Sequence, residues 1–146
     1  MTGSGRGPRV LISNRQSMPV DEASLTELAR ACLIGEGAAD SELSLSFVTA
    51  EEIADLHTRY LGEEGPTDVL SFPLGEGGGE GGARILGDVV IAPDVAATNN
   101  PIDPATELRL LLVHGILHLL GHDHETESER AEMWAQQERY AGVRLP

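Results

Sequence analysis

Residues Asp103–Gly121, with the sequence DPATELRLLLVHGILHLLG, decide the fold. Asp103 is a typical N-cap residue and Pro104 suits the first helical position, so a helix is predicted to begin here. Leucine, valine and isoleucine occupy nearly every side of this helix, and we therefore expect it to be central and buried on most of its circumference. Gly121 is suited to a left-handed cap, which would end the helix and reverse the chain.

Helices and strands alternate in the segments around this central helix. Apolar residues recur at helical spacing in three further stretches, two of which begin with a capping box. These helices are predicted at Asp21 to about Ile34, at Thr49 to Leu61 and from Thr126 onward. Short apolar runs bounded by turn residues predict four strands, at 9–13, 43–48, 68–72 and 85–91. Strands interleaved with helices predict a compact α/β or α+β domain.

The length of 146 residues suits a single domain, 1–146, with a sizeable core. We expect a flexible N-terminus at about 1–7 and a flexible glycine-rich loop at about 74–83. This loop lacks the Lys-Ser/Thr ending of a phosphate-binding loop, does not open a helix and contains two glutamates that would repel phosphate. The one cysteine, Cys32, falls at an apolar helical position and is interpreted as core packing.

The composition indicates a cytoplasmic protein with no membrane segment. No apolar run approaches the roughly 20 residues needed to cross a bilayer, and the N-terminus lacks the apolar stretch of a signal peptide. The net charge is −14, and all ten basic residues are arginine. Such a charge repels nucleic acid unless arginines or a metal ion concentrate positive charge locally.

Four of the five histidines lie within eleven residues, beginning at His114. His114 and His118 are four residues apart, so both project from the same face of the helix, one turn apart. Both imidazoles could then lie about 2.0–2.1 Å from one zinc ion. A turn at Gly121 would bring either His122 or His124 toward the face that carries His114 and His118, as a third ligand. A chain that turns tightly needs a few residues to come back to that face, which favours His124.

Three histidines without a nearby cysteine suit a catalytic zinc site that keeps an open position for water. The alternative is that the two helical histidines are core residues with hydrogen-bond partners. At the metal site, the catalytic group would be a metal-bound water with a lowered pKa. The glutamate that serves as base in His-Glu-x-x-His peptidases is replaced by Gly115, which argues against peptidase chemistry. Asp123 is the nearest carboxylate, and it would orient a ligand histidine or cap the turn.

Three segments, in order along the chain, resemble the bacterial YbeY endoribonucleases. They are Pro66–Pro73 (PTDVLSFP), Leu86–Pro93 (LGDVVIAP) and His114–His124 (HGILHLLGHDH). The resemblance implies a zinc-dependent endoribonuclease, specific for single strands, that acts in 16S rRNA 3′-end processing and ribosome quality control. It also implies one zinc ion on His114, His118 and His124, in a zincin-like fold whose small mixed sheet is flanked by helices around a buried metal helix.

The substrate side departs from this family pattern. Many members carry an arginine after the aromatic residue that precedes PTDVLSFP, but here Leu61 follows Tyr60. Arg59 lies roughly 200° around a helix from that position, so it is a candidate phosphate contact or simply a solvated charge. The resemblance suggests that three polar residues border the cleft, although they could equally satisfy backbone groups at a turn. These are Thr67, Asp68 and Ser71.

Two other functions fit a metal site. One is hydrolysis of an amide or another small substrate, and the other is ribosome assembly with a mainly structural zinc. The acidic charge further predicts that a protein partner, such as a ribosomal protein, recruits the chain to rRNA or the ribosomal subunit.

Overall fold

A four-stranded mixed sheet forms the centre of the computed structural model, which describes residues 7–62, 67–73, 84–121 and 126–141. The strand order is β1-β2-β4-β3. Strands β1, β2 and β4 run parallel, and β3 pairs antiparallel with β4 at one edge. The strands are β1 (Arg9–Asn14), β2 (Ser41–Phe47), β3 (Val69–Pro73) and β4 (Arg84–Ile91).

Five helices accompany the sheet in the described part of the chain. They are α1 (Glu22–Gly35), α2 (Ala50–Leu61), α3 (Pro93–Asn99), α4 (Pro104–Leu119) and α5 (Glu127–Ala141). The predicted α/β fold with a small mixed sheet is thus confirmed. The sequence analysis missed α3, because seven residues are too few to show helical periodicity and its only clear signal is Pro93 at the first position.

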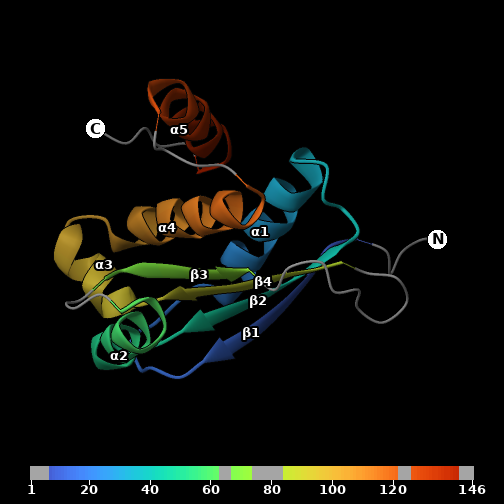
Figure 1. Cartoon of the computed structure of the whole chain (residues 1–146). Helices are drawn as coiled ribbons and strands as arrows, with labels where there is room; N and C mark the ends of the chain where they lie inside the picture. The colour runs from blue at the N-terminus through green and yellow to red at the C-terminus, as the bar shows by residue number, and fades with distance from the viewer. Residues whose placement is uncertain (1–6, 63–66, 74–83, 122–125, 142–146) are drawn as a thin grey trace.

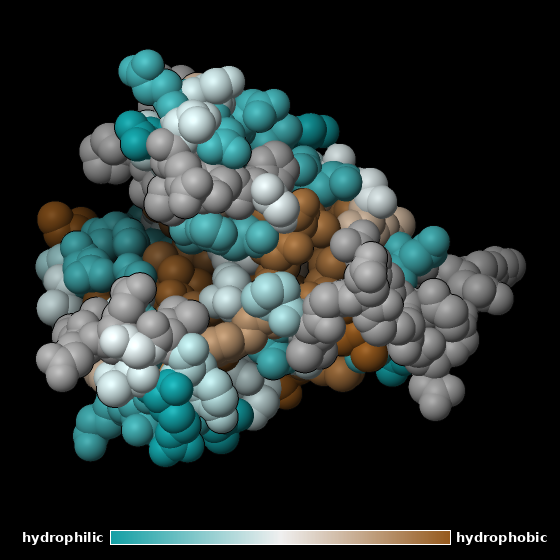
Figure 2. All heavy atoms as spheres, in the orientation of Figure 1, coloured by the Kyte–Doolittle hydropathy of each residue, from teal (hydrophilic) through white to brown (hydrophobic). Residues whose placement is uncertain are grey.

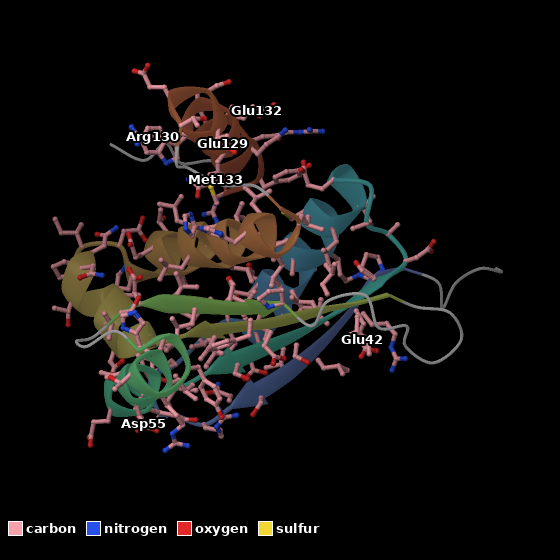
Figure 3. All side chains as sticks on the ribbon, in the orientation of Figure 1. Glu42, Asp55, Glu129, Arg130, Glu132 and Met133 are labelled. Carbon is pink, nitrogen blue, oxygen red and sulfur yellow. The ribbon has the colours of Figure 1, made fainter. Side chains whose placement is uncertain are left out.

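The helices form layers on both faces of the sheet (Figure 1). Helices α1 and α4 lie on one face, and α5 packs on the outer side of α4. Helix α2 lies on the other face. Figure 3 shows Met133 pointing from α5 toward α4, whereas Glu129 and Glu132 lie on the exposed side of α5. The main core therefore lies between the sheet and the α1, α4 and α5 helices, with a smaller core beneath α2.

Helix α4 is buried as its sequence predicted. Residues Leu110–Val113 and Gly115–Leu117 are all buried. The Asp103 side chain accepts a hydrogen bond from the backbone N–H of Thr106, which confirms it as the N-cap. Gly121 has a φ of +99°, a conformation that side chains rarely adopt, so the chain turns there as predicted.

Gly115 is the point of closest approach between α4 and the sheet. A Cβ atom at this position would lie 2.8 Å from Cγ1 of Val89 on β4 and 3.2 Å from Oγ of Ser71 on β3. Cβ atoms in proteins almost never lie within 2.8 Å of another side-chain atom. A glycine here therefore lets α4 lie against β3 and β4.

The structure does not test the two segments that were predicted to be flexible. The glycine-rich loop at 74–83, and all but Gly7 of the predicted flexible N-terminus, lie outside the described ranges. None of the described helices is long and apolar enough to span a membrane.

We predict that Gly115→Ala lowers the free energy of unfolding by about 1–3 kcal/mol, because the added methyl group overpacks the contact with Val89. Urea denaturation of Gly115→Ala, Val89→Ala and the double variant measures this. The double variant should lose clearly less than the sum of the single losses, since Val89→Ala removes the atoms that clash. Additive losses would contradict this close contact.

Candidate metal site

His114 and His118 come together on α4, one turn apart. Their ring centroids are 4.9 Å apart and the ring planes meet at 66°. Both residues are half-buried, in a part of the helix, Leu110–Leu119, whose other residues are all buried. Figure 2 shows hydrophobic residues gathered across the middle of the molecule in this view, below the largely hydrophilic surface of α5. The pair is thus held in an apolar setting, at a spacing that suits two imidazole nitrogens on one ion.

Gln137, on α5, contacts the first of these histidines. Its Oε1 lies 2.6 Å from Nδ1 of His114, and its side chain is fully buried. Gln137 is not among the site residues predicted from the sequence. The available signal was a polar residue at i+4 from Met133, in the apolar stripe that continues to Ala141.

The third predicted ligand is not part of the described structure. His122, Asp123 and His124 lie between the end of α4 and the start of α5, outside the described residues. Within the residues that are described, no three His, Cys, Asp or Glu side chains form a group that could hold a metal. His124 as the third ligand, and Asp123 as a residue that orients a ligand histidine or caps the turn, therefore remain predictions.

The two histidines that the structure describes fit a zinc ion. Two neutral imidazoles are common zinc ligands, and a hydrogen bond to the second ring nitrogen usually fixes their orientation. His114 has such a bond to Gln137. Cys32 is fully buried in the core, and burial raises the pKa of its thiol to about 12, which keeps it protonated and unfit to bind metal.

Strand β3 connects the predicted cleft residues to α4 and α3. The Ser71 hydroxyl donates a hydrogen bond of 3.1 Å to the carbonyl of Gly115, next to His114. Thr67 instead bonds to the carbonyl of Val69 in its own segment. Of the three polar residues, Ser71 therefore lies beside the histidine helix, and Thr67 satisfies a local backbone group.

Asp68 lies near the start of α4. Its carboxylate accepts a hydrogen bond from the Asn99 side chain, and its carbonyl accepts one from the Ala92 N–H. Burial, and then the nearby charge of Asp68, raise the pKa of Glu107 in the first turn of α4. Asp68 thus joins β3 to α3 and acts electrostatically on α4, two helical turns before His114.

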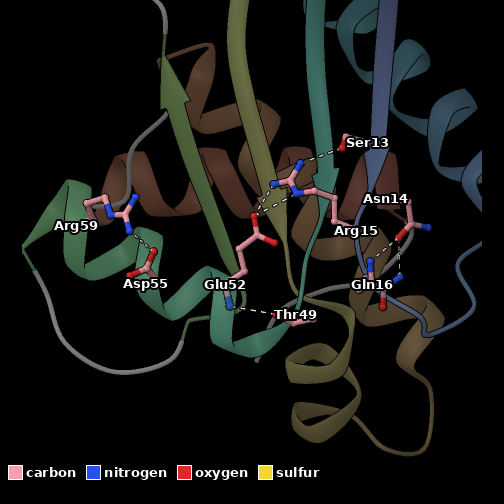
Figure 4. A network of polar contacts seen from close by, with 8 residues as sticks. All are labelled: Ser13, Asn14, Arg15, Gln16, Thr49, Glu52, Asp55 and Arg59. Atoms are coloured by element: carbon pink, nitrogen blue, oxygen red, sulfur yellow. Dashed lines mark hydrogen bonds and ion pairs between the residues drawn. The ribbon is translucent and has the colours of Figure 1, made fainter.

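Arg59 lies on α2, which packs on the opposite face of the sheet from α4. It forms an ion pair of 2.9 Å with Asp55 and is largely exposed (Figure 4). Figure 4 also shows Arg15, which follows β1, binding Glu52 of α2. Nothing in this arrangement brings Arg59 to the histidine pair.

A groove of about 540 Å³ lies on the same face as α2. It does not include the histidines, so the structure offers two separate surfaces on the two faces of the sheet. The groove is lined by Leu11, Ile12, Ser13, Ser44, Ser46, Leu56, Tyr60, Phe72, Asp88 and Val90.

The fold and site define an α/β protein with a paired-histidine helix buried against a mixed sheet. Residues 11–142 match the family model described as endoribonuclease YbeY. The chain belongs to this family.

Individual relatives agree with that assignment. The chain is 44% identical to an endoribonuclease YbeY of Thermobifida fusca over 91% of this chain and 92% of that protein. It is 46% identical to one of Frankia alni over 79% and 70% of the two chains. The solution structure of TM1509 from Thermotoga maritima superposes with a TM-score of 0.58 at 27% identity, over 90% of this chain and 86% of that one.

We predict that Asp68→Asn lowers the pKa of Glu107, because it removes a nearby negative charge. A carboxyl whose pKa is raised by folding stabilises the protein below its unfolded pKa, and this contribution is lost as pH rises through the folded pKa. Glu107→Gln should therefore be more favourable to stability at pH 7 than at pH 4. Side-chain NMR titration and denaturation at both pH values test this. An unchanged Glu107 midpoint in Asp68→Asn would refute the coupling.

Proposed function

We propose that this chain is a zinc-dependent endoribonuclease, specific for single-stranded RNA, that acts in 16S rRNA 3′-end maturation and ribosome quality control. The observation that carries the proposal is the His114–His118 pair on α4, in a chain of the endoribonuclease YbeY family. We further propose that one zinc ion is held by His114, His118 and His124, and that the protein works in the cytoplasm on rRNA within the ribosomal subunit.

Residues of α4 and β3 would have different roles in such a site. A zinc ion, when bound, supplies polarisation of a phosphoryl oxygen and activation of water. His114 and His118 bind it, and their half-buried position limits competing solvent. The hydrogen bond from Ser71 and the close contact at Gly115 hold the helix against the sheet and so fix the position of both histidines.

Hydrolysis of a peptide or another small substrate is a weaker proposal. The peptidase base would have to be a glutamate at the position of Gly115, where even a Cβ atom meets Val89 and Ser71. Residue 115 therefore cannot supply a proton acceptor, and Asp123, the nearest carboxylate in the sequence, would orient a ligand histidine or cap the turn. Turnover in a peptide or ester panel, with RNA left intact, would favour this alternative.

The second alternative is a ribosome assembly factor whose zinc is structural. The main core already joins α4 to the sheet, α1 and α5 through apolar contacts. These contacts support a chain that stays folded without metal. Chelation should therefore give a folded, inactive protein, whereas unfolding on chelation would favour the structural role.

We predict that His114→Ala lowers cleavage of a single-stranded rRNA precursor by at least about 100-fold in zinc-loaded protein, because the variant loses a metal ligand. A gel assay under single-turnover conditions measures it. His57→Ala is the matched control, since His57 is a half-buried histidine on α2, on the opposite face of the sheet. Equal cleavage by His114→Ala and the unaltered chain would refute the proposal, and a contaminating nuclease would then explain the activity.

Positive charge for binding RNA would have to come mainly from the arginines, because the chain contains no lysine. Every arginine side chain that the structure describes has a partner. Arg9, Arg15 and Arg59 pair with carboxylates, Arg30 and Arg109 bind backbone carbonyls, and Arg130 and Arg139 lie over aromatic rings. Together with the net charge of −14, this supports recruitment by a protein partner, such as a ribosomal protein.

We therefore predict that the isolated chain binds single-stranded RNA with a Kd weaker than about 10 µM at physiological salt, and that binding weakens further as salt rises. Fluorescence anisotropy with labelled RNA measures this. Adding small ribosomal subunits should increase cleavage of the precursor. Submicromolar binding of arbitrary RNA by the isolated chain would contradict partner dependence.

A further inference from the structure

Gln137 is an unusual residue for its position. It lies between Met133 and Ala141 in the buried stripe of α5, where an apolar side chain would complete the packing. Among the residues described, only Ser41 and Gln137 are polar and buried. The Ser41 hydroxyl donates to the Ala38 carbonyl, whereas Nε2 of Gln137 has no hydrogen-bond partner.

Such an unpaired donor disfavours folding, because a buried N–H loses its bonds to water and gains none in return. The stability of the fold therefore does not explain this glutamine. Its carbonyl does have a partner, the Nδ1 atom of His114, at 2.6 Å. The contact joins α5 to the first histidine of α4.

The direction of this hydrogen bond follows from the chemistry of the two groups. With its Oε1 toward the ring, Gln137 accepts, so Nδ1 of His114 carries the proton and donates. A neutral imidazole has one proton, and the nitrogen opposite to it is then the one with a lone pair for a metal ion. That nitrogen is Nε2.

We propose that Gln137 is a positioning residue, which holds His114 in the Nδ1–H tautomer and so presents Nε2 as the metal-binding nitrogen. This inference rests on the proposed metal site. The unpaired Nε2 of Gln137 is the cost of placing a carbonyl oxygen at this point in the core. Loss of a group that orients a ligand histidine typically weakens metal binding 10–100-fold.

Two variants at this position separate the acceptor from the packing. Gln137→Met has a similar size but no acceptor, and Gln137→Glu keeps an oxygen acceptor for Nδ1–H. Zinc affinity is measured by competition with a chromogenic chelator. Gln137→Met should raise the zinc Kd at least about tenfold, while Gln137→Glu binds zinc at least as tightly as the unaltered chain.

The stability of the metal-free chain provides a readout that a purely structural role would not give. Gln137→Met removes an unpaired buried donor, but it also removes the acceptor of the His114 Nδ1–H. Because these two effects oppose each other, the urea midpoint of the metal-free form should stay close to that of the unaltered protein, although its zinc binding is weaker. Met133→Leu is the matched control on the same stripe, and its zinc Kd should stay within about twofold because Met133 does not touch the histidine through a polar group.

The tautomer can be read directly in the unaltered, metal-free protein. Long-range ¹H–¹⁵N NMR spectra should show His114 protonated at Nδ1, and Gln137→Met should shift the ring toward the Nε2–H form. A dominant Nε2–H tautomer in the unaltered chain, or an unchanged zinc Kd in Gln137→Met, overturns the role of Gln137. The metal site fails separately if His114→Ala binds zinc as tightly as the unaltered chain.

Discussion

The close contact between α4 and the sheet is the constraint on which the rest of the structure depends. At Gly115 the helix lies so near Val89 and Ser71 that a Cβ atom has no room. This contact turns residue 115 toward the sheet, and His114, about 100° around the helix from it, faces α5, where its ring meets Gln137. The same contact leaves no room at residue 115 for the glutamate that serves as base in His-Glu-x-x-His peptidases.

The packing of α5 on α4 brings Gln137 to the histidine pair. Met133 and Ala141 supply apolar contacts, and Gln137 places a carbonyl oxygen against His114. The two faces of the sheet thus carry different surface features. The histidine pair lies on the side of α4, whereas the groove with Asp88 and Tyr60 lies on the side of α2. A substrate or partner that contacted both surfaces would have to pass an edge of the sheet.

Much of this architecture could be predicted from the sequence, because strong local signals decide it. The apolar run of α4 with its Asp103 cap, and the capping box at Thr126, mark their helices without tertiary information. The His114–His118 pairing follows from a spacing of four on a helix. Gln137 could not be predicted in the same way, since its partner is 23 residues away and only the packing of α5 on α4 brings them together. The contacts of Asp68 and Ser71 also depend on tertiary structure that their sequence does not reveal, whereas that of Thr67 is local.

In the proposed zinc site, α4 supplies two of three imidazole ligands, and one coordination position stays open. Zinc K-edge X-ray absorption of the zinc-loaded chain tests it most directly. The expected spectrum shows three imidazole nitrogens at about 2.0–2.1 Å, with at least one further oxygen ligand from solvent. A first shell without imidazole scattering, or one closed by four protein ligands, would contradict it.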